Sequence, residues 1–95
     1  MAFYVYMLAS RRNGTLYIGS TDNIAGRVFQ HREGAIPGFT QRYAVRTLVW
    51  FDAFETRVAA FRRERQMKEW RRAWKIALVE RENPDWLDLY ERLNW

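Results

Sequence analysis

Residues 3–19, with the sequence FYVYMLASRRNGTLYIG, decide the fold of this 95-residue chain. The two ends of this stretch, residues 3–8 and 16–18, are rich in aromatic and β-branched residues, a composition typical of β-strands. Between them stands Asn13-Gly14, a dipeptide that favours a tight turn between two antiparallel strands. The stretch therefore predicts a β-hairpin.

A helix, a loop and a third strand are predicted after the hairpin. Thr21 or Asp22 can cap a helix that runs to about Glu33, with Gly34 as its C-terminal stop. Residues 34–45 contain two glycines and a proline, which predicts an ordered loop. Residues 47–51 form an apolar run and predict the third strand.

The second half of the chain is predicted to be helical. One helix is expected over about residues 55–70 and another over about residues 72–82. Asn83-Pro84 is typical of a helix cap followed by the first helical residue. This pair predicts a short last helix that runs through Leu93.

The predicted element order is β-β-α-β-α-α-α, which indicates an α+β fold with a small three-stranded antiparallel sheet flanked by helices. The length fits a single domain over residues 1–95, with residues 83–95 as a short C-terminal helical extension. Hydrophobic residues make up 48% of the chain and aromatic residues 17%, so enough apolar material is present for a packed core.

The composition excludes several classes of protein. The chain has no cysteine, which excludes disulfide scaffolds, thiolate zinc sites and cysteine nucleophiles, and its single histidine excludes sites built on a histidine pair. It contains neither a long apolar run nor the pattern of a secretory signal. We therefore expect a soluble, cytoplasmic protein without a membrane partner.

The positive charge is concentrated in one part of the chain. The formal net charge is +5, and 14 of the 16 basic residues are arginine, which suits bidentate contact with phosphate. Residues 54–75 carry a net charge of +5, whereas residues 76–95 carry −3. This distribution is typical of a face offered to a polyanion, and also of a solvated helix surface.

Five side chains could carry chemistry. Tyr6 and Tyr17 can approach each other across the hairpin, and Arg27 and His31 are four residues apart on one helix face. Glu64 lies beside the apolar stripe of its helix, among arginines, where a carboxylate could hold a divalent cation. Each feature has a structural alternative: a core aromatic pair, an exposed polar face and an ion pair with arginine. The residue pattern alone leaves both interpretations open.

Taken in order, these features resemble the GIY-YIG endonuclease superfamily. The resemblance rests on Tyr4-Val5-Tyr6, a gap of ten residues, Tyr17-Ile18-Gly19, and then Arg27, His31 and Glu64. More narrowly, the chain is similar to small stand-alone bacterial GIY-YIG proteins, on the segments 38–43, 63–68 and 83–89. The chain departs from the family name at Tyr4, where the name has glycine.

The resemblance implies a role for each matched residue. Glu64 would bind Mg²⁺ (or Mn²⁺), Arg27 would neutralise charge on the phosphorane, and Gly19 would allow close backbone approach. A tyrosinate, Tyr6 first and Tyr17 as the alternative, would take a proton from water. Tyrosine titrates near pH 10, so a cation and His31 would have to lower its pKa.

The implied function is metal-dependent hydrolysis of phosphodiester bonds in DNA, with structured or damaged DNA, as in repair or recombination, as the candidate substrate and RNA as the alternative. Two other functions stay open: a catalytically weak nucleic-acid-binding module of the same fold, and a partner-binding structural domain. A monomer and a weak dimer are both compatible with the sequence. The expected nucleic-acid-binding residues are Arg42, Arg62, Arg63, Arg65, Lys68, Arg71 and Arg72, with Arg42 and Arg46 as an alternative face.

Overall fold

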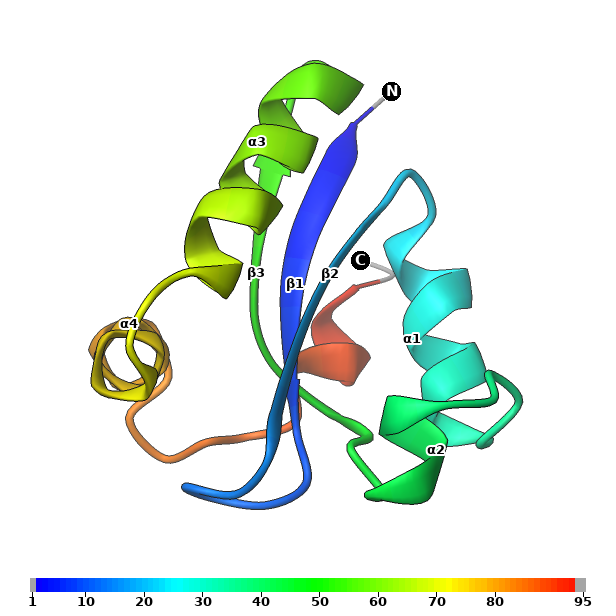
Figure 1. Cartoon of the computed structure of the whole chain (residues 1–95). Helices are drawn as coiled ribbons and strands as arrows, with labels where there is room; N and C mark the ends of the chain where they lie inside the picture. Colours follow the sequence, from blue (N-terminus) through cyan, green and yellow to red (C-terminus); the bar gives the residue numbers. More distant parts are fainter. Residues whose placement is uncertain (1, 94–95) are drawn as a thin grey trace.

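The computed structural model describes residues 2–93 of the chain; residues 1, 94 and 95 of the predicted domain lie outside the described part. The described part folds into three strands, four α-helices and one 3₁₀ helix (Figure 1). In chain order these are β1 (Phe3–Ala9), β2 (Leu16–Thr21), α1 (Ile24–Arg32), α2 (Phe39–Arg42), β3 (Thr47–Phe54), α3 (Arg57–Lys68), α4 (Arg72–Glu82) and the 3₁₀ helix η1 (Leu89–Arg92).

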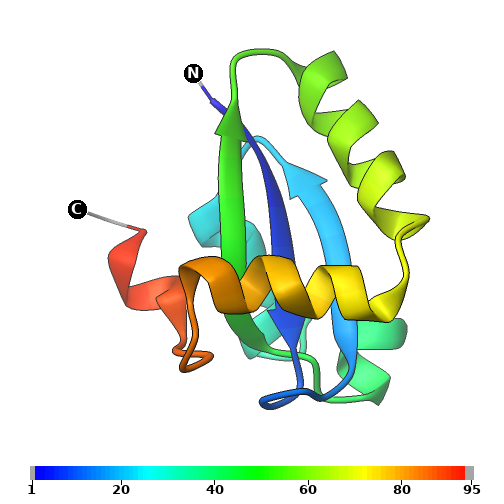
Figure 2. The same cartoon turned by 90° about the vertical axis from the view of Figure 1, so that its left-hand side faces the viewer.

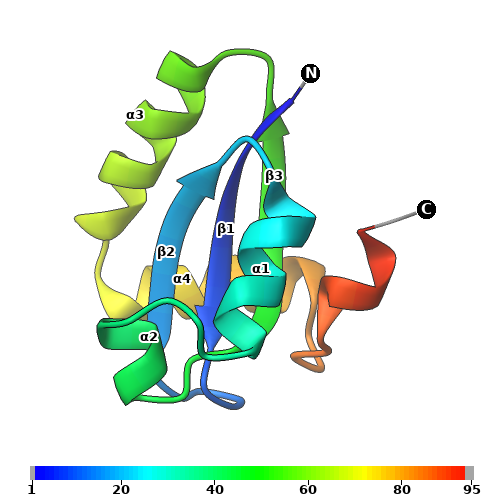
Figure 3. The same cartoon turned by 90° about the vertical axis from the view of Figure 1, so that its right-hand side faces the viewer.

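The three strands form one antiparallel sheet in the order β2-β1-β3, which confirms the predicted α+β fold class. β1 is the central strand, and β2 lies at one edge. Helices α3 and α4 cover one face of the sheet (Figure 2), whereas α1, α2 and η1 lie on the other (Figure 3). Among the described residues, no helix is long and apolar enough to cross a membrane.

Side chains alternate along β1, so this strand contributes to two separate cores. Val5, Met7 and Ala9 pack on the α3 and α4 side, together with Met67 and Val79. Tyr6 and Leu8 pack on the opposite side, in a core that also contains Ile24 and Val28 of α1. Because both faces of the sheet are covered, residues 5–9 are all buried.

A β-bulge interrupts the pairing of β1 with β3. Met7 pairs with Trp50 and Leu8 with Leu48, which leaves Val49 as the additional residue. The buried Asn83 side chain reaches this point, because its Nδ2 donates a hydrogen bond of 3.0 Å to the Val49 carbonyl. The segment after α4 is thereby attached to the sheet.

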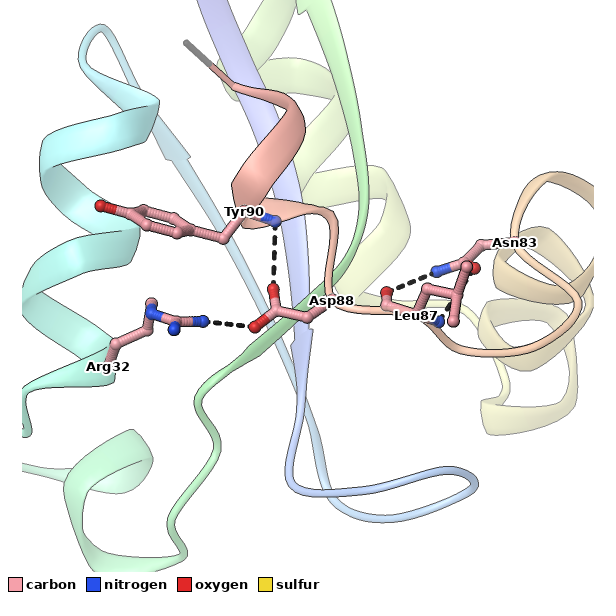
Figure 4. Close-up of polar contacts among 5 residues, drawn as sticks. All are labelled: Arg32, Asn83, Leu87, Asp88 and Tyr90. Carbon is pink, nitrogen blue, oxygen red and sulfur yellow. Dashed lines mark hydrogen bonds and ion pairs between the residues drawn. The ribbon is translucent and has the colours of Figure 1, made fainter.

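The predicted helix from Pro84 to Leu93 is wrong. Asn83 ends α4, and its side chain makes two hydrogen bonds with the backbone of Leu87 (Figure 4). The Asn83 Nδ2 donates to the Leu87 carbonyl, and the Leu87 amide donates to the Asn83 Oδ1. These bonds hold the chain in a turn, and only Leu89–Arg92 is helical, as η1.

The C-terminal segment is also attached to α1. Asp88 caps η1 by accepting a hydrogen bond from the Tyr90 amide, and it forms an ion pair with Arg32 of α1 (Figure 4). The Arg32 guanidinium lies over the Tyr90 ring, 4.6 Å from its centroid. The segment 83–89, which resembles the small stand-alone proteins, therefore joins α4, β3 and α1.

Other element boundaries also differ from the prediction. Asn23, rather than Thr21 or Asp22, caps α1, because its Oδ1 accepts a hydrogen bond from the Gly26 amide. The segment predicted as a loop, residues 34–45, contains the one-turn helix α2. The helix expected over residues 55–70 is shorter, because Thr56 caps it at its start and it ends at Lys68.

Candidate active site

Tyr6 and Gly19 are direct partners in the β1–β2 ladder. A Cβ atom added to Gly19 would lie 2.5 Å from the Tyr6 hydroxyl oxygen and 2.7 Å from its Cζ atom, closer than such atoms approach one another. Gly19 lies within a regular strand, so space rather than an unusual backbone conformation requires glycine. Because Gly19 has no side chain, the Tyr6 phenol can occupy the space above residue 19.

Tyr17 lies on the same face of the sheet as Tyr6. It pairs with Leu8, two residues along β1, and the two tyrosine ring centroids are 6.3 Å apart. This confirms that the two rings approach each other across the hairpin. The Tyr17 ring also lies 5.4 Å from the His31 ring and stacks at 6.4 Å on Phe39 of α2.

His31 connects Tyr6 to a residue that the sequence analysis missed. Its Nε2 atom lies 3.1 Å from the Tyr6 hydroxyl oxygen, and its Nδ1 atom lies 2.9 Å from Oγ1 of Thr40. His31 and Thr40 are only 3% and 4% exposed. Thr40 belongs to α2, in the segment predicted as a loop, and the available signal was its place in the motif of residues 38–43.

The protonation states of these groups follow from their burial. Burial lowers the pKa of His31, and the nearby Arg27 charge lowers it further, so the imidazole is neutral at physiological pH. Burial raises the pKa of Tyr6; Tyr17 and Glu64 raise it further, and Arg27 opposes them. In the free protein, the pKa of Tyr6 is therefore raised rather than lowered, and Tyr6 is a neutral phenol.

Arg27 lies on α1, one helical turn before His31. Its side chain is exposed, and it forms no ion pair with any of the described residues. It lines a surface pocket of about 240 Å³ together with residues of the β2–α1 connection, among them Thr21 and Asn23. The guanidinium is thus close enough to influence Tyr6 and His31 and remains available to an anion.

Glu64 reaches β2 from the opposite face of the sheet. Its Oε1 accepts a hydrogen bond of 2.5 Å from Oγ of Ser20, the residue after Gly19. Its Oε2 lies 2.7 Å from Nζ of Lys68, one turn further along α3, and the Glu64 side chain is 12% exposed. The structural alternative for Glu64 was an ion pair with arginine; in the free protein its partner is a lysine.

The five side chains therefore lie on the two sides of the edge strand β2. Successive residues of β2 point to opposite faces, so Tyr17 and Gly19 lie on the α1 side, whereas Ser20 lies on the α3 side. The tyrosines, His31 and Arg27 approach from one face and Glu64 from the other. Glu64 is nevertheless close enough for its charge to raise the pKa of Tyr6.

Comparison with known proteins agrees with this geometry. The family described as the GIY-YIG catalytic domain matches residues 2–77. The chain belongs to the GIY-YIG family. The family match confirms the resemblance inferred from the motifs, and a GIY-YIG domain is a nuclease-type fold.

Relatives of this GIY-YIG chain carry the name UPF0213 protein. The relative from Staphylococcus haemolyticus is 31% identical over 77 residues, which is 81% of this chain and 93% of the relative. The relative from Natronomonas pharaonis is 38% identical over 76 residues, 80% of this chain and 88% of the relative. The solution NMR structure of the UPF0213 protein BH0048 from Bacillus halodurans has 28% identity and a TM-score of 0.58, covering 99% of this chain and 98% of that chain.

Tyr4 is the position where this GIY-YIG chain departs from the family name. Tyr4 pairs with Thr21 in the ladder, and its ring packs edge-on against Phe51 of β3, with 6.4 Å between centroids. A larger residue fits here because the ring packs across the sheet against Phe51, at the border of the core on the α1 side.

The oxygen donors at Glu64 are its own carboxylate and the Ser20 hydroxyl. Within residues 2–93, no group of three or more acidic or histidine side chains could hold a metal ion. Glu64 supplies one carboxylate, a donor set compatible with Mg²⁺, which is commonly bound by one or two carboxylates, water and substrate phosphate. In the free protein, Lys68 supplies the positive charge at Glu64.

The predicted nucleic-acid-binding residues of this GIY-YIG domain fall into separate groups. Arg72 contacts the hairpin turn, since its Nη2 donates hydrogen bonds to the carbonyls of Asn13 and Gly14. The guanidinium groups of Arg63, Arg71 and Arg42 lie over the rings of Trp70, Trp74 and Tyr43, respectively. Arg62 and Arg65 line a pocket beside Ser20.

Proposed function

We propose that this protein is a metal-dependent endonuclease that hydrolyses phosphodiester bonds in DNA. The observation that carries the proposal is the arrangement around β2. The Tyr6 hydroxyl, held in the space left by Gly19, contacts the imidazole of His31, while the Glu64 carboxylate reaches the same strand from the other face. A base, a cationic side chain and a carboxylate ligand are three groups that phosphodiester hydrolysis needs.

Tyr6 acts as the base in this proposal. Its proton passes to Nε2 of His31, while the Tyr6 oxygen takes a proton from the water that attacks phosphorus and the bond to the leaving oxygen breaks. The leaving oxygen takes a proton from a solvent water, and His31 returns its extra proton to solvent. His31 can accept this proton because its imidazole is neutral, and the Thr40 hydroxyl holds the other ring nitrogen. Tyr17 is the alternative base, since its ring also lies against His31.

Arg27 stabilises the negative charge that develops on the phosphoryl oxygens. Its exposed guanidinium lies one helical turn before His31 and is not engaged in an ion pair within the described part of the chain. A guanidinium can donate two hydrogen bonds to one phosphate. The same charge opposes the rise in the pKa of Tyr6, so Arg27 assists both events.

Glu64 is the proposed ligand of the divalent cation, Mg²⁺ or Mn²⁺. When bound, the cation would polarise the scissile phosphate and supply positive charge near Tyr6. Ser20 keeps one Glu64 oxygen on the β2 side of the site. Lys68, which contacts the other Glu64 oxygen in the free protein, would then be available to contact a phosphate.

Nuclease assays on several substrates test the proposal. The protein is incubated with flap, branched, single-stranded and double-stranded DNA and with RNA, each with Mg²⁺, with Mn²⁺ and with a chelator. Structured or damaged DNA, of the kind handled in repair and recombination, is the first substrate class to examine. We expect a product that requires the cation and disappears in Glu64→Gln. Binding to nucleic acid without any Glu64-dependent product would instead identify a binding module of the same fold.

A further inference from the structure

A second pocket lies along α3 and reaches Ser20 of β2, the hydrogen-bond partner of Glu64. It is a surface pocket of about 630 Å³. Its lining residues combine one hydroxyl, three guanidinium groups and two apolar side chains, and they are Ser20, Arg57, Val58, Phe61, Arg62 and Arg65. The proposed reaction gives no role to Arg57, Val58, Phe61, Arg62 or Arg65. Ser20 takes part only through its hydrogen bond to Glu64.

The helical periodicity of α3 builds this pocket from two adjacent rows. Arg57, Phe61 and Arg65 follow one another at intervals of four residues, and Val58 and Arg62 form the neighbouring row. Phe61 is 50% exposed and Val58 is 59% exposed, and neither belongs to the two cores of the sheet. An apolar surface between guanidinium groups fits a ligand that has both a flat ring and a phosphate.

The pocket is joined to the candidate active site through Ser20. The same hydroxyl that lines the pocket donates the hydrogen bond to Oε1 of Glu64. A ligand in the pocket would therefore lie next to the carboxylate proposed to hold the cation. A nucleotide that neighbours the phosphate bound near Glu64 would be within reach of this pocket.

We propose that this pocket binds one nucleotide of the substrate strand, with its base against Phe61 and Val58 and its phosphate on Arg62 and Arg65. The inference rests on the proposed nuclease function and adds a nucleotide subsite to it. It implies that the nucleotide next to the cleaved bond presents an unpaired base. The pocket thus selects among DNA structures by the local accessibility of one base.

The three arginines have different parts in this subsite. Arg57 forms an ion pair of 3.1 Å with Asp22 and lies 4.9 Å over the Phe3 ring, so its charge is already compensated within the protein. Arg65 lies over the Phe61 ring at 5.6 Å, which places its charge beside the apolar surface. Arg62 extends from the neighbouring row. We therefore assign the phosphate to Arg62 and Arg65.

Binding measured without turnover tests the subsite. A fluorescent oligothymidylate and an abasic oligonucleotide of equal length and charge are titrated with the protein in the presence of a chelator. Base stacking on an aromatic side chain is expected to make the oligothymidylate bind about tenfold more tightly than the abasic strand. Phe61→Ala should abolish this preference. Phe29→Ala is the matched control, because Phe29 is 51% exposed on α1 and lies outside the pocket, and it should retain the preference.

The phosphate contacts are tested with the same two oligonucleotides. Arg62→Gln combined with Arg65→Gln should weaken binding of both strands equally and reduce the salt dependence by about 0.7 per lost phosphate contact on a single strand. A wild-type protein that binds both strands equally, or a Phe61→Ala variant that keeps the preference, would overturn the subsite. If the base preference is absent but the protein still cleaves DNA, the subsite is wrong and the nuclease proposal stands. If the preference depends on Phe61 but no cleavage is found, the subsite stands and the nuclease proposal is wrong.

Discussion

Gly19 lies directly opposite Tyr6 in the β1–β2 ladder, and the Tyr6 hydroxyl occupies the space where any other residue would place its Cβ atom. The second glycine of the family's motif is thus explained by the tyrosine across the strand pair. The hydroxyl can contact His31 at 3.1 Å because nothing at residue 19 displaces the ring.

Gly19→Ala should displace the Tyr6 ring and break its contact with His31. Because β1 is buried on both faces, we expect the free energy of unfolding to fall by about 1–3 kcal/mol, together with nuclease activity. Denaturant titration and the cleavage assay provide the two measurements. The double variant with Tyr6→Phe should lose less stability than the sum of the single variants, since the nearest clashing atom is then absent. Additive losses would contradict the proposed steric cause.

Tyr6→Phe and Tyr17→Phe distinguish the two possible bases, since each removes one oxygen and keeps the ring. If Tyr6 is the base, its replacement should lower turnover by a factor of about 10²–10⁴, whereas the Tyr17 variant should lose less. The pH–rate profile provides the second measurement, and the limb due to the base should vanish in the Tyr6 variant alone. A larger loss in the Tyr17 variant would reverse the assignment.

Thr40→Val should leave Nδ1 of the buried His31 without its hydrogen-bond partner. We expect a loss of about 1–3 kcal/mol in the free energy of unfolding, because an unsatisfied polar atom is then buried. Turnover should fall as well, since the imidazole loses the contact that orients it. Thr40→Ser restores the hydroxyl and should recover most of the activity. A Ser variant as inactive as the Val variant would show that the methyl group, rather than the hydroxyl, is required.

Stability should fall on mild acidification because of His31. Burial and Arg27 lower the pKa of His31 below its ordinary value of 6.5, so the unfolded chain binds a proton more readily than the folded protein. The free energy of unfolding is therefore highest above pH 6.5 and decreases as the pH falls through and below that value. Urea titrations at about pH 7.5 and about pH 5.5 measure the difference. His31→Gln should show a smaller difference than the wild type, and an equal difference would contradict this explanation.

Glu64→Gln and Lys68→Gln should have opposite effects on the affinity for the divalent cation. Glu64→Gln removes the proposed ligand, so it should abolish cleavage while changing stability by only about 1 kcal/mol or less, because the amide keeps the volume and the Lys68 side chain, 49% exposed, can be solvated instead. Lys68→Gln removes the ammonium group that competes for Oε2, so Mn²⁺ should bind more tightly in the absence of substrate. Calorimetric titration with Mn²⁺ checks this. Weaker binding by the Lys68 variant would place the cation elsewhere.

The hairpin and the tyrosine pair could be predicted because their signals are local. Alternating aromatic residues and the Asn13-Gly14 turn determine which residues share a face, and Asn13 does adopt a positive φ of 56°. The helix positions of Arg27 and His31 followed from their spacing in the same way. These features depend on residues close to one another in the chain.

The remaining parts of the site depend on contacts between distant residues. Ser20 and Glu64 are 44 positions apart, and neither the hydrogen bond between them nor the Lys68 ion pair has a local sequence signal. Thr40 was missed because the single turn of α2 lies in a segment whose glycines and proline indicate a loop. The C-terminal helix was mispredicted because the Asn83 side chain binds the backbone of a later residue instead of capping a helix.

Asn83 also determines which part of the chain unfolds as one unit. Its side chain makes three hydrogen bonds, two to Leu87 and one to Val49 of β3, so the C-terminal segment cannot separate from the sheet without breaking the buried bond to Val49. The family match ends at residue 77, yet Leu78, Val79, Trp86 and Leu89 beyond it are buried in the two cores. The cooperative folding unit therefore extends beyond the part of the chain that defines the family, and Trp86 and Leu89 stay inaccessible to a protease for as long as the sheet itself persists.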